Sequence, residues 1–320
     1  MNKKKILFGY AFDRKGFTSL ENKFELIYPT DSKFTNEEII DLLPGVEVLV
    51  PNFSAKSYVG KEVIDAGIDL KLICNYGVGY DNIDVKYAAK KGIIVTNTPT
   101  SVLEPTAELA FGHILATARM IGYFNTKLHN KAKVDWSLFG DLGMPVYGTT
   151  LGIYGMGRIG QAIARRAVTF GMKIIYHNRR RLDPSIEAKY NAKHVDFDTL
   201  LTESDFLSLN APATSETKHI IGEAELKKMK QSAILINTAR GSLVDEQALI
   251  KALRTKEILA AGLDVYENEP KISPELLELD NVVLTPHVGT KTLAYRLDMQ
   301  YEVVKNIINY YDGKEIDQVN

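Results

Sequence analysis

Short apolar runs rich in β-branched residues alternate along the chain with stretches whose apolar residues recur at helical spacing. In the N-terminal third, strands are predicted at residues 5–10, 24–28, 46–50, 70–75 and 93–96. Helices are predicted between them at residues 36–43, 61–66 and 85–91. Because parallel strands need a crossover such as a helix, this alternation indicates a parallel sheet covered on both faces.

A second series of alternating strands and helices begins near residue 149. Its strands are predicted at residues 150–154, 173–177, 194–195, 206–210, 233–237, 260–265 and 281–285. A long helix over residues 101–119 is expected to join the two series. A last helix over residues 293–311 has apolar residues on one side, and we expect it to return to the first series. The pattern therefore predicts two α/β domains.

The segment between the connecting helix and the second series, residues 125–147, has no regular pattern. It contains the single tryptophan, Trp136. Irregular segments of this length usually have a function. We expect this one to contact a second subunit or to cover an active site.

Composition narrows the class of protein. The chain has 320 residues, a length typical of two domains, with 39 Lys and Arg against 40 Asp and Glu. This balance predicts no general attraction to nucleic acid or to anionic membranes. The lone cysteine, Cys74, rules out an internal disulfide and a cysteine-based zinc site. No apolar stretch reaches the roughly 20 residues that cross a membrane. We expect a cytoplasmic protein, and we expect no metal site.

A glycine-rich loop follows the predicted strand at residues 150–154. It has the spacing G-x-G-x-x-G, formed by Gly155, Gly157 and Gly160, and leads into a helical pattern and another strand. In this context Gly155 permits a tight turn, Gly157 lets the backbone approach a pyrophosphate, and Gly160 lets helix and strand pack closely. The helix N-terminus then offers N–H groups and a positive dipole end to the phosphates. The alternative is a tight turn that binds no ligand.

The end of the next strand bears on which dinucleotide binds. An NAD site usually places a carboxylate there for the ribose hydroxyls. This chain has no carboxylate at that point; it has His177 and Asn178, and then the arginines Arg179, Arg180 and Arg181. Guanidinium groups suit the oxygens of a 2′-phosphate, so the pattern favours NADP(H) over NAD(H), with NAD(H) still possible. The alternative is a solvated basic loop that leaves the cofactor choice relaxed.

Three later strands lead into polar residues. Arg240 follows one strand and His287 follows the third. The strand between them has Asp264 near its end and is followed by Glu267 and Glu269. In one parallel sheet, these groups would meet at the edge that carries the glycine-rich loop, where open α/β sheets bind ligands. A histidine can donate a proton to a carbonyl oxygen, a carboxylate favours the imidazolium, and an arginine can pair with a substrate carboxylate. Taken singly, each has an ordinary alternative: a surface ion pair, a loop end or a structural histidine.

Gly77 and Gly79 follow the predicted strand at residues 70–75. Paired glycines after a strand can present backbone N–H groups to an anion. A glycine turn before the helix at residues 85–91 is an equally good interpretation of the same pattern.

Together these motifs resemble the D-isomer-specific 2-hydroxyacid dehydrogenase family over nearly the whole chain. The resemblance is carried by residues 75–84, 97–99, 106–108, 151–160, 237–241, 263–270 and 286–289. Residues 98–103 and 176–181 are most similar to the NADPH-dependent glyoxylate/hydroxypyruvate reductases of that family, some of which also reduce 2-ketogluconate.

The resemblance implies a Rossmann-like dinucleotide-binding domain inserted into a flavodoxin-like substrate-binding domain, with parallel sheets and the active site in the cleft between them. It places the substrate-binding domain at residues 1–99 and 289–320, and the dinucleotide-binding domain at residues 100–288. It also implies a homodimer joined through the dinucleotide-binding domain, which would give residues 125–147 a role.

The resemblance also assigns roles to single residues. The substrate arginine falls on Arg240, its paired glutamate on Glu269 and the acid–base histidine on His287. Amides that bind the substrate carboxylate fall on Val78 and Gly79. Dinucleotide contacts implied by the resemblance are Thr106, Met156, Arg158, Ile159, Ala211, Pro212, Thr217, Thr238, Ala239, Asp264 and Gly289. They join Gly155, Gly157, Gly160, His177, Asn178, Arg179 and Arg180 from the patterns above.

The expected activity is the reduction of small 2-oxo acids, such as glyoxylate or hydroxypyruvate, to D-2-hydroxy acids by hydride transfer from NADPH. An NAD-dependent phosphoglycerate or D-lactate dehydrogenase is an alternative within the family. A dinucleotide-sensing, corepressor-like binding protein is an alternative of another class. Substrate choice is expected to depend on residues 51–54 and on the segment around Trp136.

Overall fold

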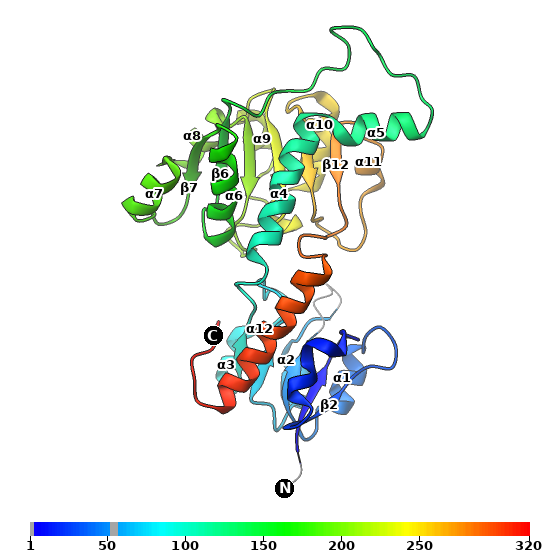
Figure 1. The fold of residues 1–320 in the computed structure, drawn as a ribbon, viewed down its shortest axis with the longest axis vertical. Helices are drawn as coiled ribbons and strands as arrows, with labels where there is room; N and C mark the ends of the chain where they lie inside the picture. Colours follow the sequence, from blue (N-terminus) through cyan, green and yellow to red (C-terminus); the bar gives the residue numbers. More distant parts are fainter. Residues whose placement is uncertain (1–2, 52–56) are drawn as a thin grey trace. The chain divides into compact units, whose positions relative to one another are not determined.

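The computed structural model describes residues 3–51 and 57–320. The chain divides into two compact units, coloured along the sequence in Figure 1. Unit 1 comprises Met1–Val102 and Thr290–Asn320, and unit 2 comprises Leu103–Gly289. Of the residues expected to shape substrate choice, residues 52–54 lie outside the described part of the chain.

Unit 1 is built on a five-stranded sheet in which neighbouring strands pair in parallel. Its strands are β1 (Lys4–Phe8), β2 (Phe24–Ile27), β3 (Val46–Val50), β4 (Leu72–Cys74) and β5 (Ile94–Thr96). Their spatial order, β2-β1-β3-β4-β5, is that of a flavodoxin-like doubly wound sheet. One face is covered by η1 (Arg14–Leu20) and α12 (Leu293–Tyr311), and the other by α1 (Asn36–Leu42), α2 (Lys61–Ala66) and α3 (Val85–Lys90).

The last helix, α12, packs on unit 1, as its apolar side predicts. Val303 and Ile307 are fully buried in the cluster that also contains residues of β1 and η1. Glu302, on the same helix, is buried and accepts hydrogen bonds from the backbone N–H groups of Thr100 (3.0 Å) and Ser101 (2.9 Å). Apolar burial and a carboxylate acceptor therefore both hold this C-terminal helix to unit 1.

Unit 2 is built on a seven-stranded parallel sheet. Its strands are β6 (Thr150–Tyr154), β7 (Lys173–His177), β8 (Ala192–His194), β9 (Phe206–Leu209), β10 (Ile234–Asn237), β11 (Ala260–Leu263) and β12 (Val282–Leu284). The spatial order is β12-β11-β10-β9-β6-β7-β8. The chain order reverses between β6 and β9, and such a switch point is where doubly wound sheets bind ligands.

Helices cover both faces of this sheet (Figure 1). One face is covered by α4 (Leu103–Ala118) and α6 (Arg158–Thr169), and the other by α8 (Phe197–Glu203), α9 (Glu223–Lys228) and α10 (Glu246–Thr255). Shorter or peripheral elements are α5 (Ile121–His129), α7 (Pro184–Tyr190), η2 (Gly241–Leu243) and α11 (Pro274–Leu277). Every residue of β9, β10 and β11 is buried, which explains their continuous apolar runs. The predicted α/β class with two parallel sheets is confirmed.

Several elements differ from the sequence prediction, and β8 and α5 are two of them. The strand predicted at residues 194–195 is β8, which begins earlier and pairs with β7 through Ala192. The segment predicted to be irregular from residue 125 continues α5 as far as His129. Met120 adopts a left-handed backbone conformation (φ +54°), which ends α4 and starts a new helix. A periodicity argument does not detect such a reversal, because it depends on one backbone angle.

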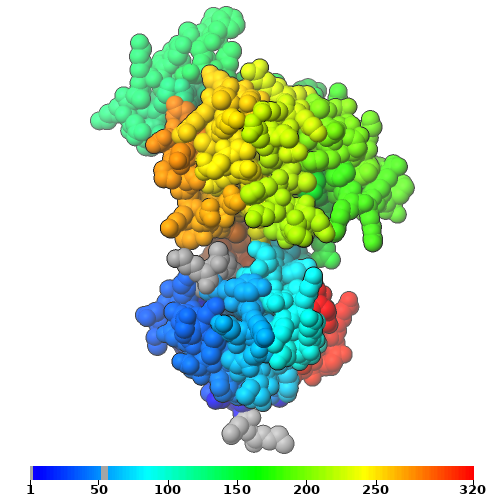
Figure 2. Space-filling model, turned by 180° about the vertical axis from the view of Figure 1, so that it is seen from behind, coloured from blue at the N-terminus to red at the C-terminus, as the bar shows by residue number. Residues whose placement is uncertain are grey.

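Residues 130–149 contain no helix or strand and project from the rest of unit 2 (Figures 1 and 2). Trp136, Leu138 and Phe139 expose 88%, 88% and 86% of their surface. Large apolar side chains gathered on one exposed segment indicate an interaction surface. In the described part of the chain, no helix combines the length and the apolar character needed to cross a membrane.

Candidate active site

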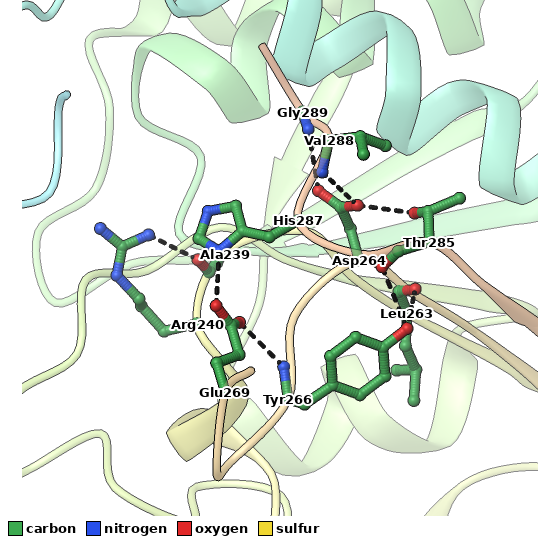
Figure 3. A network of polar contacts seen from close by, with 10 residues as sticks. All are labelled: Ala239, Arg240, Leu263, Asp264, Tyr266, Glu269, Thr285, His287, Val288 and Gly289. Carbon is green, nitrogen blue, oxygen red and sulfur yellow. Dashed lines mark hydrogen bonds and ion pairs between the residues drawn. The ribbon is translucent and has the colours of Figure 1, made fainter. Parts of the chain in front are cut away.

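The three polar groups predicted to meet do so at one edge of the unit 2 sheet. Strands β10, β11 and β12 are neighbours and run in parallel, so the segments that follow them leave the sheet on the same side. Arg240 follows β10, Glu269 follows β11 and His287 follows β12. Figure 3 shows the three side chains together, with the carboxylate of Glu269 directed at the imidazole of His287.

Arg240 is held by a turn that Asn237 organises. The side-chain oxygen of Asn237 accepts from the N–H of Ala239 (3.1 Å), and its amide nitrogen donates to the carbonyl oxygen of Arg240 (2.9 Å). The next residue, Gly241, packs so closely that a Cβ there would lie 2.0 Å from the backbone of Tyr266. The Arg240 turn is therefore locked against the segment that carries Glu269.

Glu269 and His287 form a hydrogen-bonded pair. Glu269 Oε2 lies 2.7 Å from His287 Nδ1, and Glu269 Oε1 accepts from the N–H of Tyr266 at 3.1 Å. Burial acts to raise the pKa of Glu269, but the hydrogen bond and charge of His287, the Tyr266 N–H and Arg240 together hold that pKa below its usual value. Because a carboxylate accepts at Nδ1, the proton lies there, and Nε2 is the nitrogen that can serve a substrate.

His287 sits in a backbone conformation that few histidines adopt. Its φ is +52°, in the left-handed region. Its N–H donates to the carbonyl oxygen of Asp264 (2.8 Å), and the carboxylate of Asp264 accepts from the N–H groups of Val288 (2.8 Å) and Gly289 (3.0 Å). Burial raises the pKa of Asp264, while the hydrogen bonds from Thr285 and from the two N–H groups oppose that rise. Asp264 thus fixes the turn that carries His287.

A second imidazole–carboxylate pair lies in the same region and was not predicted from the sequence. His219 Nε2 lies 2.6 Å from Glu267 Oε1, and His219 also has a left-handed φ, +51°. The N–H of His219 donates to the carbonyl oxygen of Ser242, so this residue bridges the segments that carry Arg240 and Glu269. No local signal could reveal the pair, because the partners lie 48 residues apart. Asn237 did carry a signal, since Asn commonly organises such turns.

The glycines of the loop after β6 face three different steric environments. Gly155 has φ +88°, and a Cβ there would lie 2.8 Å from the N atom of Ala211. Gly157 would place a Cβ in open space among the described residues, and Gly160 would place one 2.8 Å from the carbonyl oxygen of Gly155. The loop therefore packs against the segment after β9, at the switch point of the sheet, and is open at Gly157.

The N-terminus of α6 fits a pyrophosphate. Among the described residues, no hydrogen bond uses the backbone N–H groups of Arg158, Ile159 or Gly160. The N–H of Met156 is already used, since it donates to Asn178 Oδ1 at 2.7 Å. Three unused donors at the positive end of a 12-residue helix form an anion site.

Other residues predicted to contact a dinucleotide gather beyond the same strands. A Cβ at Gly289 would contact both Asp264 and Thr106, so these three residues are neighbours. The hydroxyl of Thr238 is buried and has no hydrogen-bond partner in the described part of the chain. Thr217 closes the loop after β9 by donating to the carbonyl oxygen of Pro212 (2.7 Å). A buried hydroxyl without a partner is what a bound ligand would satisfy, so these residues fit a dinucleotide.

The arginines after β7 do not form one cluster. Arg181 donates two hydrogen bonds to Glu187, at 2.9 and 2.8 Å, and these bonds engage its guanidinium. The side chain of Arg179 is 88% exposed, and its contact with Glu216 is a loose one of 3.8 Å. The sequence placed three guanidiniums near the ribose position, and the structure shows that one of them, Arg181, is engaged by a partner six residues ahead on α7. Arg179 and the exposed Arg180 are the available pair.

In unit 1, the glycine loop after β4 directs its carbonyl groups into the protein. The side chain of Asn75 donates to Gly79 O (2.6 Å), and that of Asn97 donates to Val78 O (2.8 Å). No hydrogen bond among the described residues uses the N–H groups of Val78 or Gly79. N–H groups without a partner among the described residues, in a loop whose carbonyl groups are hydrogen-bonded, fit the anion-binding interpretation better than the interpretation as a plain turn. The described residues contain no cluster of metal-binding side chains.

Comparison with known proteins identifies the family. A model of the NAD-binding domain of D-isomer specific 2-hydroxyacid dehydrogenases matches residues 111–289. The chain is 45% identical over 317 residues to the glyoxylate reductase of Thermococcus litoralis, covering 98% of this chain and 95% of that protein.

Solved structures agree with this match. A glyoxylate reductase from Paecilomyes thermophila superposes with a TM-score of 0.90 at 37% identity, covering 100% of this chain and 99% of that one. An NADPH-dependent glyoxylate/hydroxypyruvate reductase from Sinorhizobium meliloti, solved with NADP and malonate, superposes with a TM-score of 0.89 at 31% identity, covering 99% and 97%. The chain therefore belongs to the D-isomer-specific 2-hydroxyacid dehydrogenase family and is an oxidoreductase.

Proposed function

We propose that this enzyme reduces small 2-oxo acids, such as glyoxylate or hydroxypyruvate, to D-2-hydroxy acids, and that it prefers NADPH. The observation that carries the proposal is the His287–Glu269 pair beside Arg240, at the sheet edge that also bears the glycine-rich loop. The names of the relatives, glyoxylate reductase and NADPH-dependent glyoxylate/hydroxypyruvate reductase, support the choice of substrate class.

The residues of the site have different roles in the proposed carbonyl reduction. A reduced nicotinamide, when bound, supplies the hydride that becomes the new C–H bond at the carbonyl carbon. His287 donates the proton from Nε2 to the carbonyl oxygen, so a hydroxyl group forms and the imidazolium becomes neutral. Arg240 pairs with the substrate carboxylate and polarises the carbonyl, and the N–H groups of Val78 and Gly79 bind the same carboxylate.

Glu269 has a supporting role in this scheme. Although burial opposes its ionisation, His287 and the other donors keep the pKa of Glu269 below its usual value. The group is therefore a carboxylate at neutral pH, where its charge favours the protonated imidazole. The pair also fixes the plane of the ring, so that Nε2 is aimed in one direction.

The preference for NADPH rests on Arg179 and Arg180. No carboxylate stands at the end of β7, where one would repel a 2′-phosphate. Both arginines are exposed, and guanidinium groups bind phosphate oxygens well. His177 and Asn178 complete the adenosine end of the proposed site, and NAD(H) is the weaker alternative.

The proposal extends to domains and assembly. The substrate-binding domain would be residues 1–99 and 289–320, and the dinucleotide-binding domain residues 100–288. The exposed aromatic residues of the segment after α5, Trp136 and Phe139, would be covered by a second copy in a homodimer joined through the dinucleotide-binding domain. We place the enzyme in the cytoplasm.

A substrate panel tests the proposal. The purified protein is mixed with NADPH or NADH and a series of 2-oxo acids, and loss of the reduced-nicotinamide absorbance is followed. We expect turnover with glyoxylate or hydroxypyruvate, faster with NADPH. Turnover confined to NADH with pyruvate or 3-phosphohydroxypyruvate would favour the lactate or phosphoglycerate alternatives. Tight NADPH binding without turnover on any acid would indicate a dinucleotide-sensing protein.

Replacing the available arginines tests the cofactor assignment. The Arg179→Ala/Arg180→Ala double variant is expected to raise the KM for NADPH about tenfold or more, because two charge-assisted contacts are lost. The KM for NADH should stay within about twofold. Arg181→Ala is the matched control, since its guanidinium already binds Glu187, and it should leave the ratio of the two KM values unchanged. Equal effects on both cofactors in the double variant would contradict the assignment.

Removing the proposed proton donor tests the chemistry. His287→Ala should lower kcat by roughly 10²- to 10⁴-fold, the usual contribution of a general acid. NADPH binding, followed by nicotinamide fluorescence, should stay within about twofold. His129→Ala, at an exposed histidine of α5, serves as the control and should keep its turnover. Near-normal turnover in His287→Ala would remove this residue from the mechanism.

A further inference from the structure

His113, on α4, is a buried histidine that the proposed chemistry does not use. His113 is only 2% exposed, and its Nε2 lies 2.9 Å from the hydroxyl oxygen of Thr285. Its Nδ1 has no hydrogen-bond partner in the described part of the chain. Burial lowers the pKa of His113 to about 4, so the ring is neutral at physiological pH.

The contact with Thr285 belongs to a chain of hydrogen bonds with a fixed direction. The Thr285 hydroxyl donates to Asp264 Oδ1 at 2.6 Å. A hydroxyl has one hydrogen, so toward His113 the same oxygen must accept, and Nε2 of His113 must carry the proton. The chain thus runs from His113 through Thr285 to Asp264. Asp264 in turn accepts from the N–H groups of Val288 and Gly289, as Figure 3 shows.

The chain ends on the turn that carries the proposed proton donor. The left-handed backbone of His287 persists only where its surroundings fix it, and Asp264 supplies those contacts through its carbonyl and carboxylate groups. Asp264 is only 1% exposed, so protein groups rather than solvent set the orientation of its carboxylate. Thr285 is the one side-chain donor to Asp264 among the described residues, and His113 sets the rotation of that hydroxyl.

The packing around α4 brings His113 to this position. Gly262, in β11, would place a Cβ 3.0 Å from His113 Cβ and 3.0 Å from Thr117 Oγ1. The missing side chain therefore lets α4 approach β11 closely. A neutral imidazole with one unpartnered nitrogen is a poor choice for stability alone, since an apolar side chain avoids that desolvation cost.

We infer that His113 and Thr285 are positioning residues for the turn that carries His287, and that they act on the placement of His287 through Asp264. The inference rests on the proposed role of His287 as the proton donor. Neither residue contacts the substrate, and each acts only by fixing the next group in the chain.

The test compares His113→Leu, Thr285→Val and the double variant with the wild-type enzyme. His113→Leu should lower kcat about tenfold and Thr285→Val at least as much, while the KM for the 2-oxo acid and the affinity for NADPH stay within about threefold. The double variant should be no worse than Thr285→Val, because residues of one chain are not additive. His113→Gln, whose amide N–H can take the place of Nε2–H, should recover most of the turnover.

Two further measurements separate positioning from stability. The urea midpoint of His113→Leu should not fall, because an unpartnered buried nitrogen has been removed. Amide hydrogen exchange of residues 285–289 should be faster in His113→Leu and Thr285→Val and restored in His113→Gln. Thr117→Val is the matched control: it removes another unpartnered polar group from the same helix and should change neither turnover nor exchange.

The outcomes distinguish this inference from the proposed function. Unchanged exchange and unchanged kcat in His113→Leu, with turnover lost in His287→Ala, would overturn the positioning role alone. A fall in both urea midpoint and kcat that His113→Gln does not reverse would make His113 a structural residue. Faster exchange in His113→Leu, in a protein that reduces no 2-oxo acid, would uphold the positioning chain and overturn the proposed function.

Discussion

A buried carboxylate must be surrounded by donors, and in this protein that requirement shapes the candidate active site. Asp264 lies at the end of β11 with almost no exposure, and its two oxygens accept from Thr285, Val288 and Gly289. Satisfying the carboxylate pulls the chain after β12 into a tight turn, and that turn forces His287 into a left-handed backbone. The side chain of His287 then meets Glu269, which belongs to the segment after β11.

The fold supplies the setting in which this requirement becomes useful. The carboxyl ends of parallel strands lie at one edge of a sheet. Three neighbouring strands, β10, β11 and β12, therefore bring Arg240, Glu269 and His287 together. The glycine-rich loop follows β6, the strand beside the switch point, and packs against Ala211 after β9. The glycine-rich loop and the His287–Glu269 pair therefore occupy the same edge of one sheet.

Much of this arrangement could be predicted from the sequence, because the information was local. The strands around Val46–Val50, Thr150–Tyr154 and Lys173–His177 were predicted with their observed bounds, since apolar β-branched runs flanked by turns define them. The convergence of Arg240 and His287 followed from one rule about strand ends.

What the sequence could not supply depends on partners distant in the chain or on single backbone angles. In the sequence, Arg181 cannot be distinguished from Arg179 and Arg180, and only the position of α7 shows that it hydrogen-bonds Glu187. The His219–Glu267 pair and the contact of His113 with Thr285 join segments 48 and 172 residues apart, and no spacing in the sequence encodes either. The start of α5 as a separate helix depends on the left-handed backbone of Met120.

In the function proposed above, a carboxylate-supported imidazolium at His287 donates the proton during 2-oxo acid reduction. The most direct test is the pH dependence of kcat/KM for glyoxylate in the wild-type enzyme and in Glu269→Gln. Since Glu269 has a lowered pKa and is ionised at neutral pH, removing its charge destabilises the imidazolium. We expect the alkaline loss of activity to begin at a lower pH in the variant. An alkaline limb at the same pH, with activity reduced by one factor throughout, would contradict it.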